Sequence, residues 1–571
     1  MQPQKPPPIM SKVSKNGAVE VPQERKSNGS DSFHIVDKNL STSSSNAVLS
    51  STPLDQIEAN VARLHKRFHS ETNKLALVQF RLNQLRNLYF AVKDNIDAIC
   101  DALKKDFGRS ASESKNLEIA PGLSELLHTM SLLHKWIKPE KVTDLPLSMK
   151  STPIYVERIP LGVILIITPF NYPFFLSLAP IAGAIAAGNA VVYKPSELTP
   201  NYSALISQLF SEALDEDIFY VVNGAIPETT KALEQKYDKI MYTGNNMVGT
   251  IVAKKAAETL TPVILELGGK SPAIVLPDVT DKHLNTIARR IVWGRFTNAG
   301  QTCVAVDYVL VHESLRAKLV AQMKKVVQEQ LYPNVSKDDP SYTHIIHQRA
   351  YNNLKEVIKS TKGDVVVGGD TDDASRYIGP TIIDNASWTD SSMKNELFGP
   401  ILPVLSYKTL DDAIESLTRN HDTPLAQYIF TSGSTSRKAN KSIDQIVRRV
   451  RSGATVVNDV LLHVALVNAP FGGVGNSGHL NYHGWYSFRA FTHERTVMEQ
   501  KLWNENVLSV RYPPFNDKKD RAVALSMDKY NGNVWFGRKG DVRIGGPSTF
   551  FGFWAGIAGV AALGAAVVSA L

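Results

Sequence analysis

Cysteine is scarce in this chain, which has only Cys100 and Cys303 among its 571 residues. Two cysteines cannot form the disulfide framework of a secreted domain, so we expect the body of the protein to face a reducing compartment. Metal-binding motifs are also missing, because the 14 histidines form no His-Glu-x-x-His pattern and no Cys-x-x-Cys pair occurs. The sequence therefore predicts no metal site.

The chain also lacks a concentrated block of basic charge. Its net charge of +8 at pH 7 is modest, and Lys and Arg are interspersed with acidic residues, so nucleic-acid binding is not indicated. Residues 1–52 contain no apolar run of the kind that a secretory signal needs, and their acidic residues argue against a mitochondrial transit peptide. This extension is rich in Ser, Pro and Lys and is predicted to be disordered.

Apolar periodicity predicts ordered structure from about Leu54, with helices over residues 54–68, 73–103 and 117–136. From residue 159 to 267, short apolar runs alternate with helical segments, which is typical of a parallel sheet covered on both faces. A Rossmann-like domain follows from this pattern. Its expected strands are 161–167, 190–193, 218–222, 239–242 and 263–265, and its expected helices are 173–187, 200–214, 227–235 and 247–260. A second α/β region is expected over 271–470, with strands at 273–276, 304–311, 365–367, 377–383 and 401–407.

Three residues are candidates for catalysis. Cys303 closely follows the flexible Gly300, but a lone cysteine is also a common core residue, so both interpretations are open. Glu266 ends an apolar strand, where burial would raise its pKa and suit it to act as a general base; an ion pair with Lys270 is the alternative. Asn171 lies between prolines at a strand-to-helix turn, where its amide could bind an oxyanion, although Asn is common in turns.

Two further turns could bind a dinucleotide. Residues 243–249 connect a strand to a helix, and their glycines would let backbone N–H groups approach a phosphate, although simple turn formation would also explain them. Lys194 and Glu197 follow another predicted strand, where such side chains can bind ribose hydroxyls. A solvated turn is the alternative for this pair.

Together these segments resemble the aldehyde dehydrogenase superfamily over roughly residues 54–501. The segments that carry the resemblance are Pro169-Phe-Asn-Tyr-Pro173, Ala186-Ala-Gly-Asn-Ala190, Lys194-Pro-Ser-Glu197, Tyr242-Thr-Gly-Asn245, Glu266-Leu-Gly-Gly-Lys-Ser-Pro272, Gly300-Gln-Thr-Cys303, Glu396-Leu-Phe-Gly-Pro400 and Pro470-Phe-Gly-Gly-Val-Gly-Asn-Ser-Gly478. Residues 482–493 are similar to the class 3 branch, which includes membrane-anchored fatty aldehyde dehydrogenases. His479, His483 and His493 in and beside this segment are expected at the surface or at an interface.

The resemblance implies a catalytic role for each of the three candidates. Cys303 would attack the aldehyde as a thiolate, and Asn171 with the Cys303 backbone N–H would hold the oxyanion. Glu266 would activate the water that hydrolyses the resulting thioester.

The resemblance also implies a cofactor site, and a carboxylate at Glu197 favours NAD, with NADP as the alternative. The residues implied to contact the adenosine ribose, the pyrophosphate and the nicotinamide riboside are Lys194, Glu197, Gly244, Asn245, Gly249, Glu396 and Phe398.

The implied fold class is α/β, with a Rossmann-like NAD domain, a second α/β catalytic domain, small bridging elements and a C-terminal transmembrane helix. The expected parts are the N-terminal extension (1–52), the NAD-binding domain (53–138 and 160–265), the catalytic domain (266–472), bridging or oligomerisation elements (139–159 and 473–501), a linker (502–547) and a membrane anchor (548–571).

Residues 548–571 carry no charged side chain and are long enough to span a bilayer. Arg538, Lys539 and Arg543 precede them and would supply cytoplasmic positive charge. A tail anchor would place the enzyme in the cytosol, on the endoplasmic reticulum, the mitochondrial outer membrane or a lipid-droplet surface. A buried helix in an oligomer is the alternative.

The resemblance and the tail together predict NAD-dependent oxidation of long-chain aldehydes, such as hexadecenal or hexadecanal, to fatty acids. Relatives in the class 3 branch suggest a homodimer, with residues 139–158 and 481–495 as interface candidates. The alternatives are a dehydrogenase for short or aromatic aldehydes and a catalytically silent membrane scaffold.

Overall fold

The computed structural model describes residues 49–143, 145, 149–527, 534–535, 538 and 540–544. The predicted tail anchor at 548–571 and nearly all of the N-terminal extension lie outside these residues. Within the described part of the chain, no helix is long and apolar enough to cross a membrane.

A six-stranded sheet forms the first α/β unit, with strand order β17-β7-β6-β3-β4-β5. Its strands are β3 (Val163–Ile167), β4 (Ala190–Lys194), β5 (Phe219–Val221), β6 (Lys239–Gly244), β7 (Val263–Leu267) and β17 (Gly478–His479). Strands β3 to β7 pair in parallel, and β17 pairs antiparallel with β7. The strand order reverses between β3 and β6, and ligands bind in such sheets at the carboxyl ends beside this switch point.

Helices cover the first sheet in two groups. One group contains α2 (Val78–Lys93), α3 (Ile96–Phe107), α5 (Ala120–Trp136), α6 (Phe175–Ala187) and α7 (Pro200–Ala213), and the other contains α1 (Leu54–Phe68), α8 (Ile226–Leu233) and α9 (Asn246–Ala257). All residues of α6 are buried, as expected for a helix that is apolar on every side. It ends at Gly188, whose φ of 95° suits glycine.

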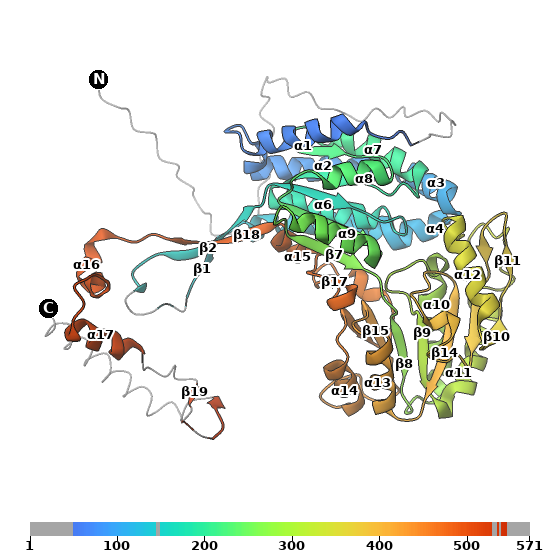
Figure 1. The fold of residues 1–571 in the computed structure, drawn as a ribbon. Coiled ribbons are helices and arrows are strands. Elements are labelled where there is room, and N and C mark those ends of the chain that lie inside the picture. The colour runs from blue at the N-terminus through green and yellow to red at the C-terminus, as the bar shows by residue number, and fades with distance from the viewer. Residues whose placement is uncertain are drawn as a thin grey trace, which may run out of the picture. The chain divides into compact units, whose positions relative to one another are not determined.

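A seven-stranded sheet forms the second α/β unit, in the order β10-β13-β14-β9-β8-β15-β16. Its strands are β8 (Pro272–Val275), β9 (Tyr308–His312), β10 (Asp364–Val367), β13 (Thr381–Asp384), β14 (Ile401–Tyr407), β15 (Ala426–Phe430) and β16 (Ala454–Val457). Its helices are α10 (Asp281–Phe296), α11 (Glu313–Lys325), α12 (Gln348–Ser360), α13 (Leu410–Asn420) and α14 (Lys441–Arg449) (Figure 1). All pairs are parallel except β10 with β13.

A third sheet links distant parts of the chain, because β2 (Ile154–Pro160) pairs antiparallel with β18 (Thr492–Met498) along its whole length. Figure 1 shows β2 and β18 side by side, extending away from the first α/β unit. The remaining elements are α4 (Ala111–Ser114), α15 (Gly484–Ala490), α16 (Glu505–Leu508), α17 (Asp517–Met527), β1 (Glu140–Lys141), β11 (Thr371–Asp372), β12 (Tyr377–Ile378), β19 (Val534–Trp535) and β20 (Arg543–Ile544).

The predicted α/β fold class is confirmed, but several element boundaries differ from the predictions. The helix expected over 73–103 is two helices, α2 and α3, separated by a turn at residues 94–95. The strand expected to begin at residue 304 begins at Tyr308, because the backbone N–H of Ala305 bonds to the Thr302 carbonyl in a turn. The strand expected over 377–383 is interrupted at Gly379 and Pro380.

Candidate active site

Hydrogen bonds join the turn that contains Asn171 to the loop that contains Cys303. The Tyr172 and Thr302 hydroxyl oxygens lie 2.8 Å apart. The Asn298 side-chain amide donates to the Asn171 carbonyl oxygen at 3.0 Å. The structure therefore brings two of the predicted catalytic residues onto adjoining loops.

The loop before Cys303 has an unusual backbone. Asn298, Ala299 and Gly300 have positive φ values of 53°, 49° and 73°. Left-handed backbone is unfavourable for residues with a side chain and persists only where surrounding contacts impose it. A Cβ atom on Gly300 would collide with the Gly399 carbonyl oxygen, so glycine is required for this close approach.

Cys303 is half-buried, whereas Cys100 is buried. Burial raises the pKa of the Cys303 thiol to about 12, and the carboxylates of Glu396 and Glu266 add to this shift. The thiol form therefore predominates at neutral pH, and the side chain must lose a proton before it can act as a nucleophile.

Glu266 is buried, and neither oxygen of its carboxyl group has a hydrogen-bond partner among the described residues. Burial holds its pKa well above the usual range because the charged form is disfavoured. The alternative ion pair with Lys270 is not formed, since the Lys270 ammonium pairs with Asp307. In the β7–β17 pairing Glu266 lies opposite Gly478, which brings the segment 470–478 against it.

Asn171 is 2% exposed, and in the described part of the chain no hydrogen bond engages its side-chain amide. Its carbonyl oxygen, in contrast, accepts hydrogen bonds from Arg109 and Asn298, both at 3.0 Å. The backbone is thus fixed while the amide keeps its capacity to donate.

A buried arginine that no sequence motif indicated holds these loops together. Arg109 is fully buried and forms an ion pair with the equally buried Glu118. One of its nitrogens, Nη1, lies 3.0 Å from the Asn171 carbonyl oxygen and 3.4 Å from Asn298 Oδ1. Glu118 in turn accepts the backbone N–H of Phe174 at 2.8 Å. Charged residues are rarely buried, so a sequence pattern could not have placed this pair in the core.

Glu396 and Phe398 lie beside the catalytic loops. Burial raises the pKa of Glu396 to about 8, while the Gly269 backbone N–H donates to its carboxylate and opposes that shift. A Cβ atom on Gly268 would collide with Glu396 Oε2, so this glycine permits close approach. The Phe398 ring meets Phe170 edge to face, with ring centroids 5.9 Å apart.

Helix α9 begins at Asn246, and only Asn245 separates it from the carboxyl end of β6 at Gly244. Asn245 caps the helix, because its side chain accepts the Val248 N–H at 2.9 Å. No acceptor among the described residues bonds to the two preceding N–H groups, those of residues 246 and 247. A Cβ atom on Gly249 would lie 2.6 Å from a methyl carbon of Leu267, so glycine lets α9 pack closely on β7.

Lys194 ends β4 and is 2% exposed. Its ammonium group donates to the Pro195 carbonyl oxygen at 2.8 Å and to Glu197 Oε2 at 3.3 Å. Burial lowers the pKa of Lys194, although the Glu197 carboxylate opposes this. The helix terminus with unbonded N–H groups, the close-packed glycines and this Lys–Glu pair fit a dinucleotide at the switch point.

The prediction for His483 is wrong. This residue is fully buried, and its Nδ1 lies 2.6 Å from Glu125 Oε2. The Glu125 carboxylate also accepts the Gly484 backbone N–H at 3.0 Å, which explains why a polar side chain is tolerated in the core. His479 and His493 are exposed.

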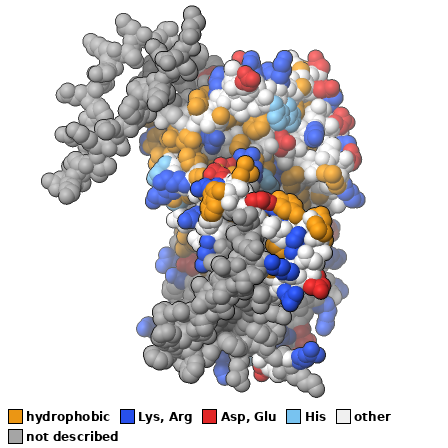
Figure 2. Space-filling model, turned by 90° about the vertical axis from the view of Figure 1, so that its left-hand side faces the viewer, with side chains coloured by type: hydrophobic (Ala, Val, Ile, Leu, Met, Phe, Trp, Pro, Cys, Tyr) orange, Lys and Arg blue, Asp and Glu red, His pale blue; other side chains and the backbone are white. Residues whose placement is uncertain are grey.

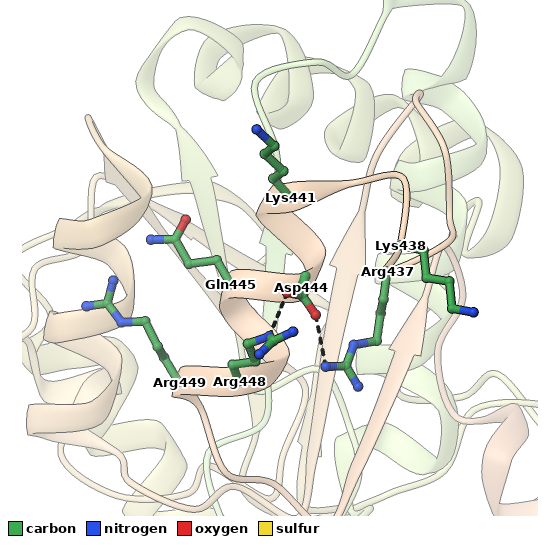
Figure 3. A pocket seen from close by; sticks show the side chains of 7 residues that line it. All are labelled: Arg437, Lys438, Lys441, Asp444, Gln445, Arg448 and Arg449. Atoms are coloured by element: carbon green, nitrogen blue, oxygen red, sulfur yellow. Dashed lines mark hydrogen bonds and ion pairs between the residues drawn. The ribbon is translucent and has the colours of Figure 1, made fainter. Parts of the chain in front are cut away.

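Other surface features do not involve the candidate catalytic and cofactor-binding residues. A hollow of about 760 Å³ on α14 is lined by basic side chains, but Figure 3 shows Lys438 and Lys441 pointing away from each other. Asp444 in its centre is bound by Arg437 at 3.0 Å and Arg448 at 2.6 Å. On the face drawn in Figure 2, basic side chains are interspersed with acidic and apolar ones. Among the described residues, no group of three or more His, Cys, Asp or Glu side chains could hold a metal ion.

Comparison with known proteins gives a consistent result. The profile of the aldehyde dehydrogenase family matches residues 29–497. The fatty aldehyde dehydrogenase HFD1 of Saccharomyces cerevisiae is 39% identical over 514 residues, which cover 87% of this chain and 94% of the yeast protein. A dimeric, NADP-preferring aldehyde dehydrogenase of Rattus norvegicus is 38% identical over 468 residues, which cover 82% of this chain and all of the rat protein.

A solved structure shares the fold. AldH of Staphylococcus aureus in a substrate-bound state superposes with a TM-score of 0.77 at 37% sequence identity. The match covers 82% of this chain and 99% of the bacterial one.

Proposed function

Since the chain belongs to the aldehyde dehydrogenase family, in its class 3 branch, we propose that it oxidises long-chain aldehydes to fatty acids with NAD. Hexadecanal and hexadecenal are the model substrates. The observation that carries the proposed chemistry is the position of the half-buried Cys303 on a loop adjoining Asn171, where its thiol is influenced electrostatically by the carboxyl group of Glu266. That carboxyl group has no hydrogen-bond partner among the described residues.

In the first step, the deprotonated sulfur of Cys303 forms a bond to the aldehyde carbon, and the carbonyl electron pair moves onto oxygen. The Asn171 amide and the Cys303 backbone N–H donate hydrogen bonds to this oxyanion. The two hydrogen bonds to the Asn171 carbonyl oxygen support the assignment, because donors that are already oriented stabilise a developing charge without reorganisation.

A nicotinamide dinucleotide, when bound, supplies the acceptor for the hydride that leaves the former aldehyde carbon. The oxyanion's electron pair re-forms the carbonyl as the hydride leaves, and a thioester to Cys303 results. The chain's part is to bind and orient it. Lys194 and Glu197 would hold the adenosine ribose, the start of α9 around Gly244, Asn245 and Gly249 the pyrophosphate, and Glu396 and Phe398 the nicotinamide riboside.

NAD is preferred in this proposal because the Glu197 carboxylate would repel a 2′-phosphate. NADP is the alternative, since the rat relative carries the name NADP-preferring. A comparison of kcat/KM for the two cofactors separates these possibilities.

In the last step, ionised Glu266 takes a proton from water, and the water oxygen attacks the thioester carbon. The carbon–sulfur bond then breaks, which releases the carboxylic acid and regenerates the Cys303 thiolate. The raised pKa of Glu266 supports this role, because a carboxylate that binds a proton tightly is a stronger base once it is ionised.

A membrane location is part of the proposal. The charge-free segment 548–571 would anchor the enzyme on a cytosol-facing membrane, where hydrophobic aldehydes are concentrated. A homodimer is also proposed, in keeping with the relative that is named dimeric. Deletion of residues 548–571 should give a soluble active enzyme; a folded but still membrane-bound truncation would refute the anchor.

The decisive experiment measures NADH production from hexadecanal and from shorter and aromatic aldehydes. Cys303→Ala should lower kcat by at least about 10³-fold because it removes the nucleophile, whereas the buried Cys100→Ala is the matched control and should remain active. Activity retained by Cys303→Ala would exclude the thiol as nucleophile. A higher kcat/KM for short or aromatic aldehydes would instead favour the second candidate function, and no NADH production at all would favour a silent scaffold.

A further inference from the structure

A cavity of about 430 Å³ lies beside the loop that leads to Cys303. Asn298 lines it, together with acidic, hydroxyl-bearing and aromatic residues. Cys303, Asn171 and Glu266 do not line it. Its size is within the range of small-molecule sites.

The charge in this cavity is of one sign, because its lining includes Glu113 and Asp339 but no Lys or Arg. Glu113 accepts hydrogen bonds from the Asn298 N–H at 2.7 Å and from the Thr343 hydroxyl at 3.0 Å. Asp339 accepts the N–H and the hydroxyl of Ser341 at 2.8 and 2.6 Å.

Neither carboxylate forms an ion pair within the described part of the chain. Arg109 is the cation that influences Glu113 electrostatically, but its guanidinium already pairs with Glu118. The cavity therefore offers negative charge that its own lining does not neutralise.

Aromatic rings form much of the remaining wall. Phe296 meets Tyr332 at 5.9 Å between ring centroids with an interplanar angle of 88°, and Tyr332 meets Tyr342 at 6.1 Å and 85°. Trp293 completes this side of the cavity. The faces of such rings attract ammonium groups, and carboxylates combined with several rings are typical of sites for organic cations.

The cavity borders the catalytic loop directly, because Thr297, Asn298 and Ala299 line it, and a hydrogen bond strengthens this contact. The Glu113 carboxylate holds the N–H of Asn298, which begins the left-handed stretch five residues before Cys303. A cation that binds Glu113 would compete for the same oxygen atoms and so change the support of a strained backbone.

We propose that this cavity binds a small organic cation of the ammonium class and that its occupancy changes the reactivity of Cys303. The ligand is recognised by the Glu113 and Asp339 carboxylates and by the faces of the surrounding rings. This proposal extends beyond the oxidation of aldehydes, and its tests require no turnover.

Calorimetric titration of the full-length enzyme with choline tests the binding. The matched control ligand is 3,3-dimethylbutan-1-ol, which has the shape of choline without its charge. We expect saturable binding of choline and binding of the alcohol that is weaker by about tenfold or more. Equal binding of both compounds, or no binding of choline, would overturn the proposal.

Variants locate the bound cation. Glu113→Gln preserves the size of the side chain and should weaken choline binding by about tenfold, whereas Asp411→Asn, on the distant surface of α13, should leave it unchanged. Cys303→Ser should also bind choline normally. Unchanged binding by Glu113→Gln, or lost binding by Cys303→Ser, would place the cation elsewhere and refute this site.

The coupling is tested by the alkylation rate of the peptide containing Cys303, followed by mass spectrometry with iodoacetamide. Saturating choline should change this rate by about fivefold or more in the unmodified enzyme and not in Glu113→Gln. An unchanged rate in the presence of bound choline would refute the coupling. Because neither cofactor nor aldehyde is present, these results are independent of whether fatty aldehydes are the substrates.

Discussion

Replacement of Arg109 by methionine tests whether a buried guanidinium holds the Asn171 turn and the Cys303 loop together. Methionine fills similar space but removes the partner of the fully buried Glu118 and both hydrogen bonds to the loops. Removing one member of a buried ion pair costs about 3–5 kcal/mol because the other charge is left unpaired. We expect a loss of that size in the free energy of unfolding.

Two further variants make this expectation specific. Arg437→Met removes an exposed arginine that pairs with Asp444, and pairs of this kind contribute only about 0–1 kcal/mol. The double variant Arg109→Met/Glu118→Gln should be more stable than Arg109→Met alone, because glutamine carries no charge and its carbonyl can still accept the Phe174 N–H. Urea denaturation measures all three, and a double variant no more stable than Arg109→Met would refute the reasoning.

The single variant Arg109→Met is also expected to impair catalysis while it remains folded. The loss of one oxyanion donor typically costs about 10²–10³ in kcat, and a displaced Asn171 should lose part of this, at least about tenfold. The KM for NAD should change little, because Arg109 contacts neither Lys194 nor Glu197. Unchanged kcat in folded Arg109→Met would show that the arginine does not position the catalytic loops.

Three other predictions follow from the site. Glu266→Gln should slow thioester hydrolysis by about 10²–10⁴-fold while leaving a stoichiometric burst of NADH, and loss of the burst would assign Glu266 to an earlier step. The rate should rise from about pH 7 to about pH 9, because Cys303, with its pKa raised to about 12, is a thiol at neutral pH and must lose a proton to react, and the raised pKa of Glu266 shifts its ionisation in the same direction; a rate that falls over this range would contradict the assignment. Glu197→Gln should raise kcat/KM for NADP relative to NAD by removing the repulsion of a 2′-phosphate, with Glu212→Gln on α7 as the control, and an unchanged ratio would show that Glu197 does not select the cofactor.

Local sequence patterns were sufficient for the α/β class and for most strands of the first sheet. Strands β3, β4 and β6 are nearly continuous apolar runs, and α6 and α7 are marked by Gly188 and Pro200, so local chemistry determines these elements. The family resemblance likewise came from short segments, because glycines and polar residues at strand ends are constrained by their immediate surroundings.

Only the tertiary structure decided which charged groups are buried and what they contact. It showed that Lys270 pairs with Asp307 and leaves Glu266 without a partner, that His483 is buried against Glu125, and that Arg109 connects two loops far apart in sequence. These facts depend on the desolvation of each group and on contacts between distant segments. The sequence thus determined the fold and the candidate residues, whereas the packing of the chain set their protonation, orientation and support.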